Sequence, residues 1–180
     1  TDQLVSPRAG IVVKPATALS VYFNYSVSYL PSAGDQFSSL DATTQALKPE
    51  KFTKYETGLK WDIRRYLSVT AATYRLDRTN TRAVDPNNPA VILQTGSQRT
   101  NGFELGVNGN VTGRWIVAGG YGYQDAFISR ATAAARAGAQ VAMVPRHTFS
   151  LWNNYRLLTR LSGGLGIIHK NLSILDQAHE

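Results

Sequence analysis

The stretch that decides the fold is Lys51–Asp62, KFTKYETGLKWD. Every second residue in its second half is aromatic, apolar or threonine: Tyr55, Thr57, Leu59 and Trp61. The residues between them are charged or glycine: Lys54, Glu56, Gly58, Lys60 and Asp62. Because a β-strand points successive side chains to opposite faces, this segment predicts a strand that is aromatic and apolar on one face and charged on the other.

The same alternation returns in GFELGVN, residues 102–108. Phe103, Leu105 and Val107 fall on one face of this second strand, while Glu104 falls on the other. Two strands that each carry one glutamate in the middle of a polar face indicate a barrel with an apolar outside and a polar inside. That arrangement is the inverse of an ordinary soluble core.

Composition excludes several classes of protein. The 180 residues are 43% hydrophobic, an ordinary value, and contain no run of about 18 apolar residues that would form a spanning helix. Without cysteine there is no disulfide framework, thiolate metal site or thiol nucleophile. The net charge of +7 is either a scattered basic excess or an attraction for anions. Because the 19 Lys and Arg match no nucleic-acid-binding motif, we expect no nucleic acid partner.

Alternation along the chain predicts eight strands, close to 6–15, 19–30, 52–62, 66–77, 91–111, 115–123, 146–155 and 161–169. The fifth is expected to break near Gly96 and Ser97. Short turns are predicted near 15–18, 62–65, 110–114 and 156–160. Long loops are predicted near 31–51, 78–90 and 126–145, the last with an Ala-rich middle that favours a helical turn.

Short and long connections therefore alternate strictly. Aromatic residues gather at the predicted strand ends: Tyr29, Trp61, Tyr66, Trp115, Tyr123, Trp152 and Tyr155. Short turns on one side, long loops on the other and flanking aromatic girdles are together typical of an antiparallel transmembrane β-barrel of the outer membrane. The fold class predicted is all-β.

Several motifs then carry a family resemblance in their order and spacing: VSPRAG (5–10), YETGLKW (55–61), YRLDRTN (74–80), QTG (94–96), GFEL (102–105), PRHT (145–148) and GGLG (163–166). In this series the chain resembles the barrel of TonB-dependent siderophore receptors, most like the catecholate type. The resemblance covers roughly residues 5 to 169.

The resemblance implies a bacterial outer-membrane barrel of about 22 strands with a plug domain inside. Such receptors take up ferric siderophore, and the TonB-ExbB-ExbD system energises them through the plug. No plug or TonB box precedes Thr1, and 170–180 lacks further strands and the terminal aromatic. We therefore expect about eight strands of a larger barrel in 1–169, an atypical tail in 170–180, and a fragment or truncated product as the whole chain.

Glu56 and Glu104 match the two wall glutamates that pair with plug arginines in the family. A carboxylate buried inside a filled barrel needs such a partner, because an unpaired buried charge is costly. The resemblance therefore implies that these two residues contact the plug. The alternative is that each faces water in the lumen, or pairs with Lys54, Lys60 or a neighbouring strand.

For the siderophore, the resemblance implies loop and lumen residues that suit an anionic chelate: Arg78, Arg82, Arg99, Gln124, Arg130 and Arg136, with Tyr74 and Phe127 as stacking partners. Each arginine has an alternative as a solvated charge or a lipopolysaccharide contact, and membrane lipid is expected around the barrel. His147, His169 and His179 lack metal-ligand spacing. Iron would arrive already chelated, so no protein-bound metal or cofactor is expected.

Two other classes compete with this interpretation. The first is a small soluble eight-stranded ligand-binding barrel with its apolar face turned inward, which alternation alone does not distinguish. The second is an outer-membrane enzyme, which requires a catalytic Ser/His/Asp set. Ser150 and His147 lie three apart on a strand and so on opposite faces. The sequence therefore predicts no enzyme.

Overall fold

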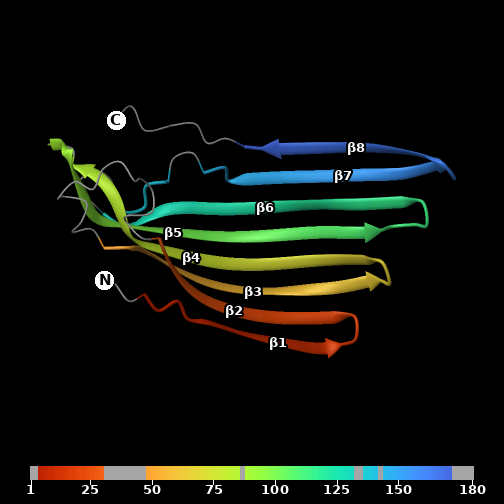
Figure 1. The fold of residues 1–180 in the computed structure, drawn as a ribbon, viewed down its shortest axis with the longest axis horizontal. Coiled ribbons are helices and arrows are strands. Elements are labelled where there is room, and N and C mark those ends of the chain that lie inside the picture. The colour runs from red at the N-terminus through yellow and green to blue at the C-terminus, as the bar shows by residue number, and fades with distance from the viewer. Residues whose placement is uncertain (1–3, 31–47, 86–87, 132–135, 142–143, 172–180) are drawn as a thin grey trace.

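The structure, a computed structural model, is a single antiparallel sheet of eight strands (Figure 1). It describes residues 4–30, 48–85, 88–131, 136–141 and 144–171, and only the backbone for 82–85 and 88–95. The strands are β1 (Arg8–Ala16), β2 (Leu19–Leu30), β3 (Glu50–Arg64), β4 (Leu67–Asp85), β5 (Asn88–Asn110), β6 (Trp115–Arg130), β7 (His147–Leu158) and β8 (Leu161–Lys170). The predicted all-β fold class is confirmed.

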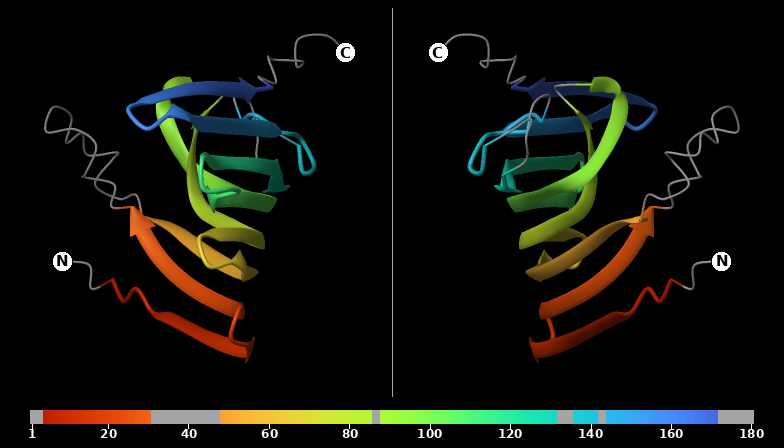
Figure 2. Two further views of the ribbon diagram at one scale, coloured as in Figure 1. Left: turned by 90° about the vertical axis from the view of Figure 1, so that its right-hand side faces the viewer. Right: turned by 90° about the vertical axis from the view of Figure 1, so that its left-hand side faces the viewer.

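The sheet is a simple meander in which each strand pairs with the next along the chain. The four short turns lie together at one end of the sheet, and the far end of the β4–β5 hairpin lies at the other (Figure 1). Seen along the strands, the sheet is a curved wall running from β1 to β8 (Figure 2). In the described part of the chain the wall does not close, since β1 pairs only with β2 and β8 only with β7.

One face of the wall carries the apolar residues, and we call it the apolar face. Cross-strand register aligns them in rows, one of which is Val13, Val21, Leu59, Ala71, Leu105, Tyr121 and Phe149. A parallel row holds Ile11, Phe23, Thr57, Thr73, Phe103 and Tyr123. Most of these large side chains are exposed, and among the described apolar side chains only those of Val27, Val117 and Ala126 are buried. A face of this kind requires an apolar surrounding outside the sheet.

The opposite face, which we call the polar face, holds Asn24, Glu56, Tyr74 and Gln124 in one row. The predicted aromatic girdle is wrong for Trp152, which lies on this face in register with Ala118 and Gly166. Its indole covers Gly164 and Gly166, where any side chain would collide with the ring. Trp152 therefore fills the space that two glycines leave on the polar face.

The predicted loop at 78–90 is wrong. Strands β4 and β5 run through it as a long hairpin in which Asp85 pairs with Asn88. Polar residues stay extended here because the backbone ladder supplies their hydrogen bonds. The ladder is irregular near Asn80, whose φ is 60°, and opposite Gly96. The predicted break near Gly96 is thus a shift in register within a continuous strand.

The other long connections differ less from expectation. Strand β6 continues to Arg130, so the predicted loop at 126–145 starts later, and a bridge from Phe127 to Gln140 lies within it. The expected helical turn falls partly on 132–135, and most of the loop at 31–51 falls on 31–47; both segments lie outside the described residues, as does the tail 172–180. In the described part of the chain, no helix is long and apolar enough to cross a membrane.

Candidate functional site: the polar face around Glu56 and Glu104

The two predicted glutamates lie on the same face of the wall, in neighbouring rows. Glu56, in β3, is in register with Asn24 and Tyr74. Glu104, in β5, is in register with Ala72 and Gly122. Even-numbered positions of β3 and β5 share this face because side chains alternate along each strand and the register keeps the alternation in phase. The predicted placement of both acids on the polar face matches the observed register.

Glu56 has partners within the sheet. The Tyr22 hydroxyl donates a hydrogen bond to Glu56 Oε1 at 2.8 Å, and the Lys54 ammonium forms an ion pair with Glu56 Oε2. The side chain of Glu56 is 18% exposed. Of the alternatives raised from the sequence, pairing with Lys54 is the one that the structure contains, and Tyr22 is a partner that sequence reasoning missed.

Two glycines make room for the tyrosines of this cluster. The Tyr22 ring lies against Gly58, where a Cβ atom would come within 2.7 Å of the ring carbon Cζ. The Tyr74 ring covers Gly102 in the same way. A tyrosine on one strand that lies flat over a glycine on the next recovers the apolar contact that glycine lacks. These glycines are therefore required for the tyrosines to reach their polar partners.

The cluster continues across the face toward β6. The Lys54 ammonium lies 5.1 Å from the centroid of the Tyr74 ring, a cation–π contact. The Tyr74 hydroxyl donates to Gln124 Oε1 at 3.4 Å, and Gln124 Nε2 donates to the Pro145 carbonyl at 3.1 Å. The polar groups around Glu56 thus form one connected network over four strands.

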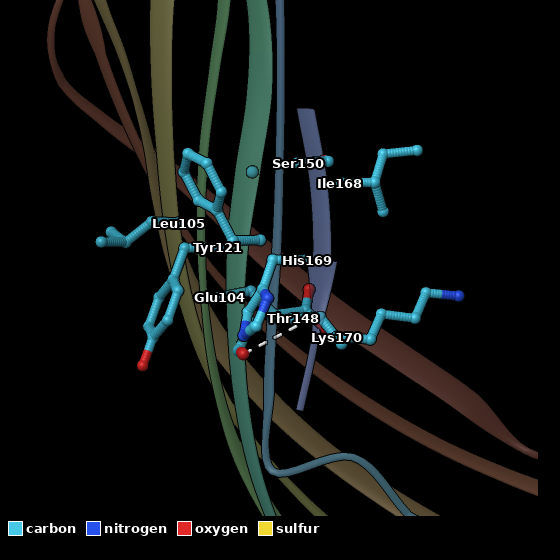
Figure 3. Close-up of a pocket in the computed structure, with 11 residues that line it drawn as sticks. Glu104, Leu105, Tyr121, Thr148, Ser150, Ile168, His169 and Lys170 are labelled. Carbon is cyan, nitrogen blue, oxygen red and sulfur yellow. Dashed lines mark hydrogen bonds between the residues drawn. The ribbon is translucent and has the colours of Figure 1, made fainter. Parts of the chain in front are cut away.

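Glu104 has different surroundings. Its nearest neighbours across the ladder, Ala72 and Gly122, are small, and so are the neighbours two residues away on its own strand, Gly102 and Gly106. It borders a depression of about 320 Å³ whose polar-face lining includes Gly120, Gly122, Thr148, Ser150 and Lys170. Figure 3 shows this region, with Leu105 and Tyr121 on one side of the sheet and Ile168 and Lys170 on the other. Glu104 has no ion pair or hydrogen bond with another described residue.

The residues predicted to contact the siderophore lie in different surroundings. Arg78 donates from Nε and Nη2 to Glu50 Oε2 at 2.9 and 2.6 Å, and Glu50 is buried. Gln124 belongs to the polar-face network. Arg130 and Arg136 are exposed, and Phe127 is half-buried. The Arg82 side chain lies outside the described residues. The structure does not bring these residues together into one cluster.

Arg99 lies on the other side of the wall. It is in register with Asp77 and Phe127, on the same face as the apolar rows, and its Nε donates to Asp77 Oδ1 at 2.6 Å. Arg75 Nε donates to the other oxygen of Asp77 at 2.9 Å. Arg75 lies in the same row as Tyr25 and Tyr55, and Asp77 and Arg99 lie in the next row. Arg99 is therefore directed away from the face that carries the two glutamates.

The described part of the polar face carries few groups that could bind a metal. Within the described ranges no group of three His, Cys, Asp or Glu side chains could hold a metal ion. His147 Nδ1 lies 2.8 Å from the Tyr121 hydroxyl, on the apolar face. What the polar face presents is a set of fixed charges and hydrogen-bonding groups suited to contact with another polar surface.

Comparison with known proteins identifies the wall. Residues 1–175 match the family described as TonB dependent receptor-like, beta-barrel. The chain belongs to the TonB-dependent receptors. It is 38% identical over 95% of its length to a probable TonB-dependent receptor, BfrD, of Bordetella pertussis. It is 34% identical over 92% of its length to the catecholate siderophore receptor Fiu of Escherichia coli.

Solved structures of TonB-dependent receptors have the same arrangement of strands. The chain superposes on the ferric-catecholate import receptor Fiu of E. coli K12 with a TM-score of 0.75 and 32% identity, over 88% of this chain and 23% of Fiu. The siderophore receptor PiuA of Acinetobacter baumannii gives 0.76 and 30%, over 91% of this chain and 25% of PiuA. The chain thus spans about a quarter of the relatives it matches.

Membership in this family decides the orientation of the two faces. TonB-dependent receptor barrels lie in the bacterial outer membrane, so the apolar face contacts lipid and the polar face lines the lumen. The alternative of a small soluble barrel with an inward apolar face is not supported. The short-turn end of the wall is the periplasmic end, and the long hairpin of β4 and β5 projects at the other.

Proposed function

We propose that this chain is part of the lumen wall of an outer-membrane receptor that imports ferric siderophores and is energised through TonB. The relatives named as siderophore receptors support this role, since they match nearly the whole chain at 32–34% identity. The observation that carries the proposal is the lumen face itself. It leaves a carboxylate, Glu104, unpaired within the described wall and surrounded by small residues, as docking of a second domain requires.

Glu104 and Glu56 serve the plug differently in this proposal. A plug arginine enters the depression beside Glu104 and forms a charge-assisted hydrogen bond there. Glu56 is already paired with Lys54, which neutralises its carboxylate. A plug donor at Glu56 therefore either displaces Lys54 or adds a second hydrogen bond to the same carboxylate. Pairing of both acids is expected because the filled lumen excludes much of the water that would otherwise solvate them.

For the siderophore, the proposal assigns the lumen and loop residues Arg78, Arg82, Gln124, Arg130 and Arg136, with Tyr74 beside them. Phe127 is left out because it is in register with Arg99, on the outward face. Arginine suits an anionic chelate because its guanidinium forms forked hydrogen bonds with oxygen acceptors. The register of Arg99 favours a different role, contact with lipopolysaccharide together with Arg75 outside the barrel. The chelated iron is the cargo, and the proposal includes no resident cofactor and no catalytic step.

The test is uptake of iron by the intact receptor that contains this chain. In a strain that lacks its own catecholate receptors, the receptor gene is expressed under iron limitation, and accumulation of radioactive iron is measured with ferric catecholate, hydroxamate and carboxylate siderophores. We expect uptake of at least one ferric siderophore, most readily a catecholate, that disappears when TonB is deleted.

A matched variant is the same receptor with Glu104→Gln, which removes the unpaired carboxylate and keeps β5 in the wall. Outer-membrane abundance is measured by immunoblot for both proteins. Uptake that persists without TonB, or a correctly inserted receptor that transports none of the three siderophore classes, contradicts the proposal.

A further inference from the structure

Positive charge is concentrated at the short-turn end of the wall. Counting each turn with its flanking residues, the four turns hold seven basic side chains: Lys14, Lys60, Arg64, Arg65, Arg114, Arg156 and Arg160. The same segments contain one acid, Asp62. The rest of the chain has twelve basic and eleven acidic residues. Six of the seven net positive charges therefore lie at one end of the sheet, and we call the seven side chains the basic rim.

All seven side chains of the basic rim are exposed. By register Lys60 and Arg156 lie on the polar face, so the turn residues Arg65, Arg114 and Arg160 are the ones placed to reach a surface outside the barrel. Three of them have partners: Lys60 lies 3.5 Å from Asp62, Arg64 donates to the Val111 carbonyl at 3.0 Å, and Arg65 lies over the Tyr66 ring. The other four, Lys14, Arg114, Arg156 and Arg160, form no ion pair or hydrogen bond through their side chains with described residues. Their charges are available to an external anion.

The apolar neighbours of the basic rim identify the kind of surface that it meets. Exposed aromatic and aliphatic side chains stand beside it on the same turns: Trp61, Ile63, Tyr66, Trp115, Tyr155, Leu157, Leu158 and Leu161. Indole and phenol groups prefer the level of lipid headgroups, and arginine or lysine extends from there to the phosphates. A protein partner or a soluble anion would not require this border of exposed leucine and tryptophan.

We propose that the basic rim binds anionic phospholipid headgroups of the periplasmic leaflet and so fixes the depth of the barrel in the membrane. Forked guanidinium donors suit the phosphate oxygens, and the repetition of cations on all four turns covers the whole width of the wall. The inference rests on membrane insertion, a property of the family, and does not depend on siderophore uptake.

The experiment uses the full receptor that contains this chain, with Arg65, Arg114 and Arg160, which lie on three of the short turns, changed together to Gln. The matched control changes Arg8, Arg130 and Arg136 to Gln, which removes the same charge from exposed positions away from the short turns. Native mass spectrometry measures the relative affinity for phosphatidylglycerol over phosphatidylethanolamine. Each basic residue near an anionic surface contributes about fivefold. We therefore expect the turn variant to lose roughly 100-fold of that preference at low salt and the control to lose little.

Resistance of the folded barrel to dodecyl sulfate at room temperature, in bilayers of phosphatidylethanolamine alone, is measured first. Because phosphatidylethanolamine has no net charge, this measurement shows whether each variant inserts and folds without any contribution from anionic lipid. Given insertion, an unchanged lipid preference in the turn variant overturns the proposal, and so does an equal loss in the control. If the turn variant instead loses binding to peptidoglycan sacculi, whose stems carry carboxylates, and keeps its lipid preference, the basic rim serves that polymer and the lipid proposal is wrong.

Discussion

Glu56 and Glu104 occupy the same face, in adjacent rows, at equivalent points of the alternating pattern, yet their surroundings differ. Glu56 is covered by Tyr22 and paired with Lys54, so the wall itself satisfies this carboxylate. Glu104 is surrounded by Ala72 and glycines and has no partner within the described wall. A matching motif therefore does not give matching chemistry, because a strand residue takes its partners from its neighbours across the ladder.

The largest effect is expected at Glu104. Glu104→Gln leaves the plug cation without its counter-charge, and breaking a buried pair by removing one partner costs about 3–5 kcal/mol. We expect uptake of ferric siderophore to fall at least roughly tenfold, with normal receptor in the outer membrane. Glu56→Gln is the matched comparison and should cost clearly less. Equal losses of uptake in the two variants would mean that both acids contribute equally to plug contact, and would contradict the prediction.

Gly102→Val tests whether the tyrosines depend on the glycines. A side chain at 102 collides with the Tyr74 ring, and overpacking of this kind costs about 1–3 kcal/mol. Heat-induced loss of the folded band on gels should occur at a lower temperature. Gly10→Val is the control, because a Cβ atom there has its nearest contact at 3.4 Å. Equal stability of the two variants would contradict the proposed packing.

Tyr22→Phe keeps the ring over Gly58 and removes only the hydrogen bond to Glu56. The expected loss is about 1 kcal/mol of unfolding free energy in denaturant titration, the usual contribution of one such bond. Tyr74→Phe should cost less, since the bond from its hydroxyl to Gln124 is longer, 3.4 Å against 2.8 Å. A larger loss for Tyr74→Phe would show that Gln124 matters more than Glu56.

The smallest expected effect is the coupling between Lys54 and Glu56. Both remain partly exposed, at 41% and 18%, so water weakens their attraction. A double-mutant cycle of Lys54→Met and Glu56→Gln should give a coupling energy of about 0.5 kcal/mol. In uptake, Glu56→Gln should become more harmful once Lys54 is absent, because Glu56 is then as available to the plug as Glu104. Strict additivity would contradict the idea that Lys54 competes for Glu56.

Sequence reasoning was most successful where the signal is local. The alternation in 55–61 and 103–107 places the two glutamates opposite the aromatic residues whatever lies on the next strand. It failed at 78–90, where polar, Asn- and Pro-containing residues look like a loop but are held as a hairpin by pairing between β4 and β5. The composition of this segment does not reveal that backbone hydrogen bonds between β4 and β5 keep its polar residues extended.

The sequence by itself determined the strand periodicity, the short turns and the family. Each of these follows from patterns among residues that are close together in the sequence. Tertiary structure alone decided that Tyr22 reaches Glu56, that Tyr74 covers Gly102, that Arg78 pairs with Glu50 and that Arg99 is directed outward. The physical reason is register, since partners 28 to 34 residues apart meet only once the strands are aligned, and a shift of one residue would turn each side chain to the other face.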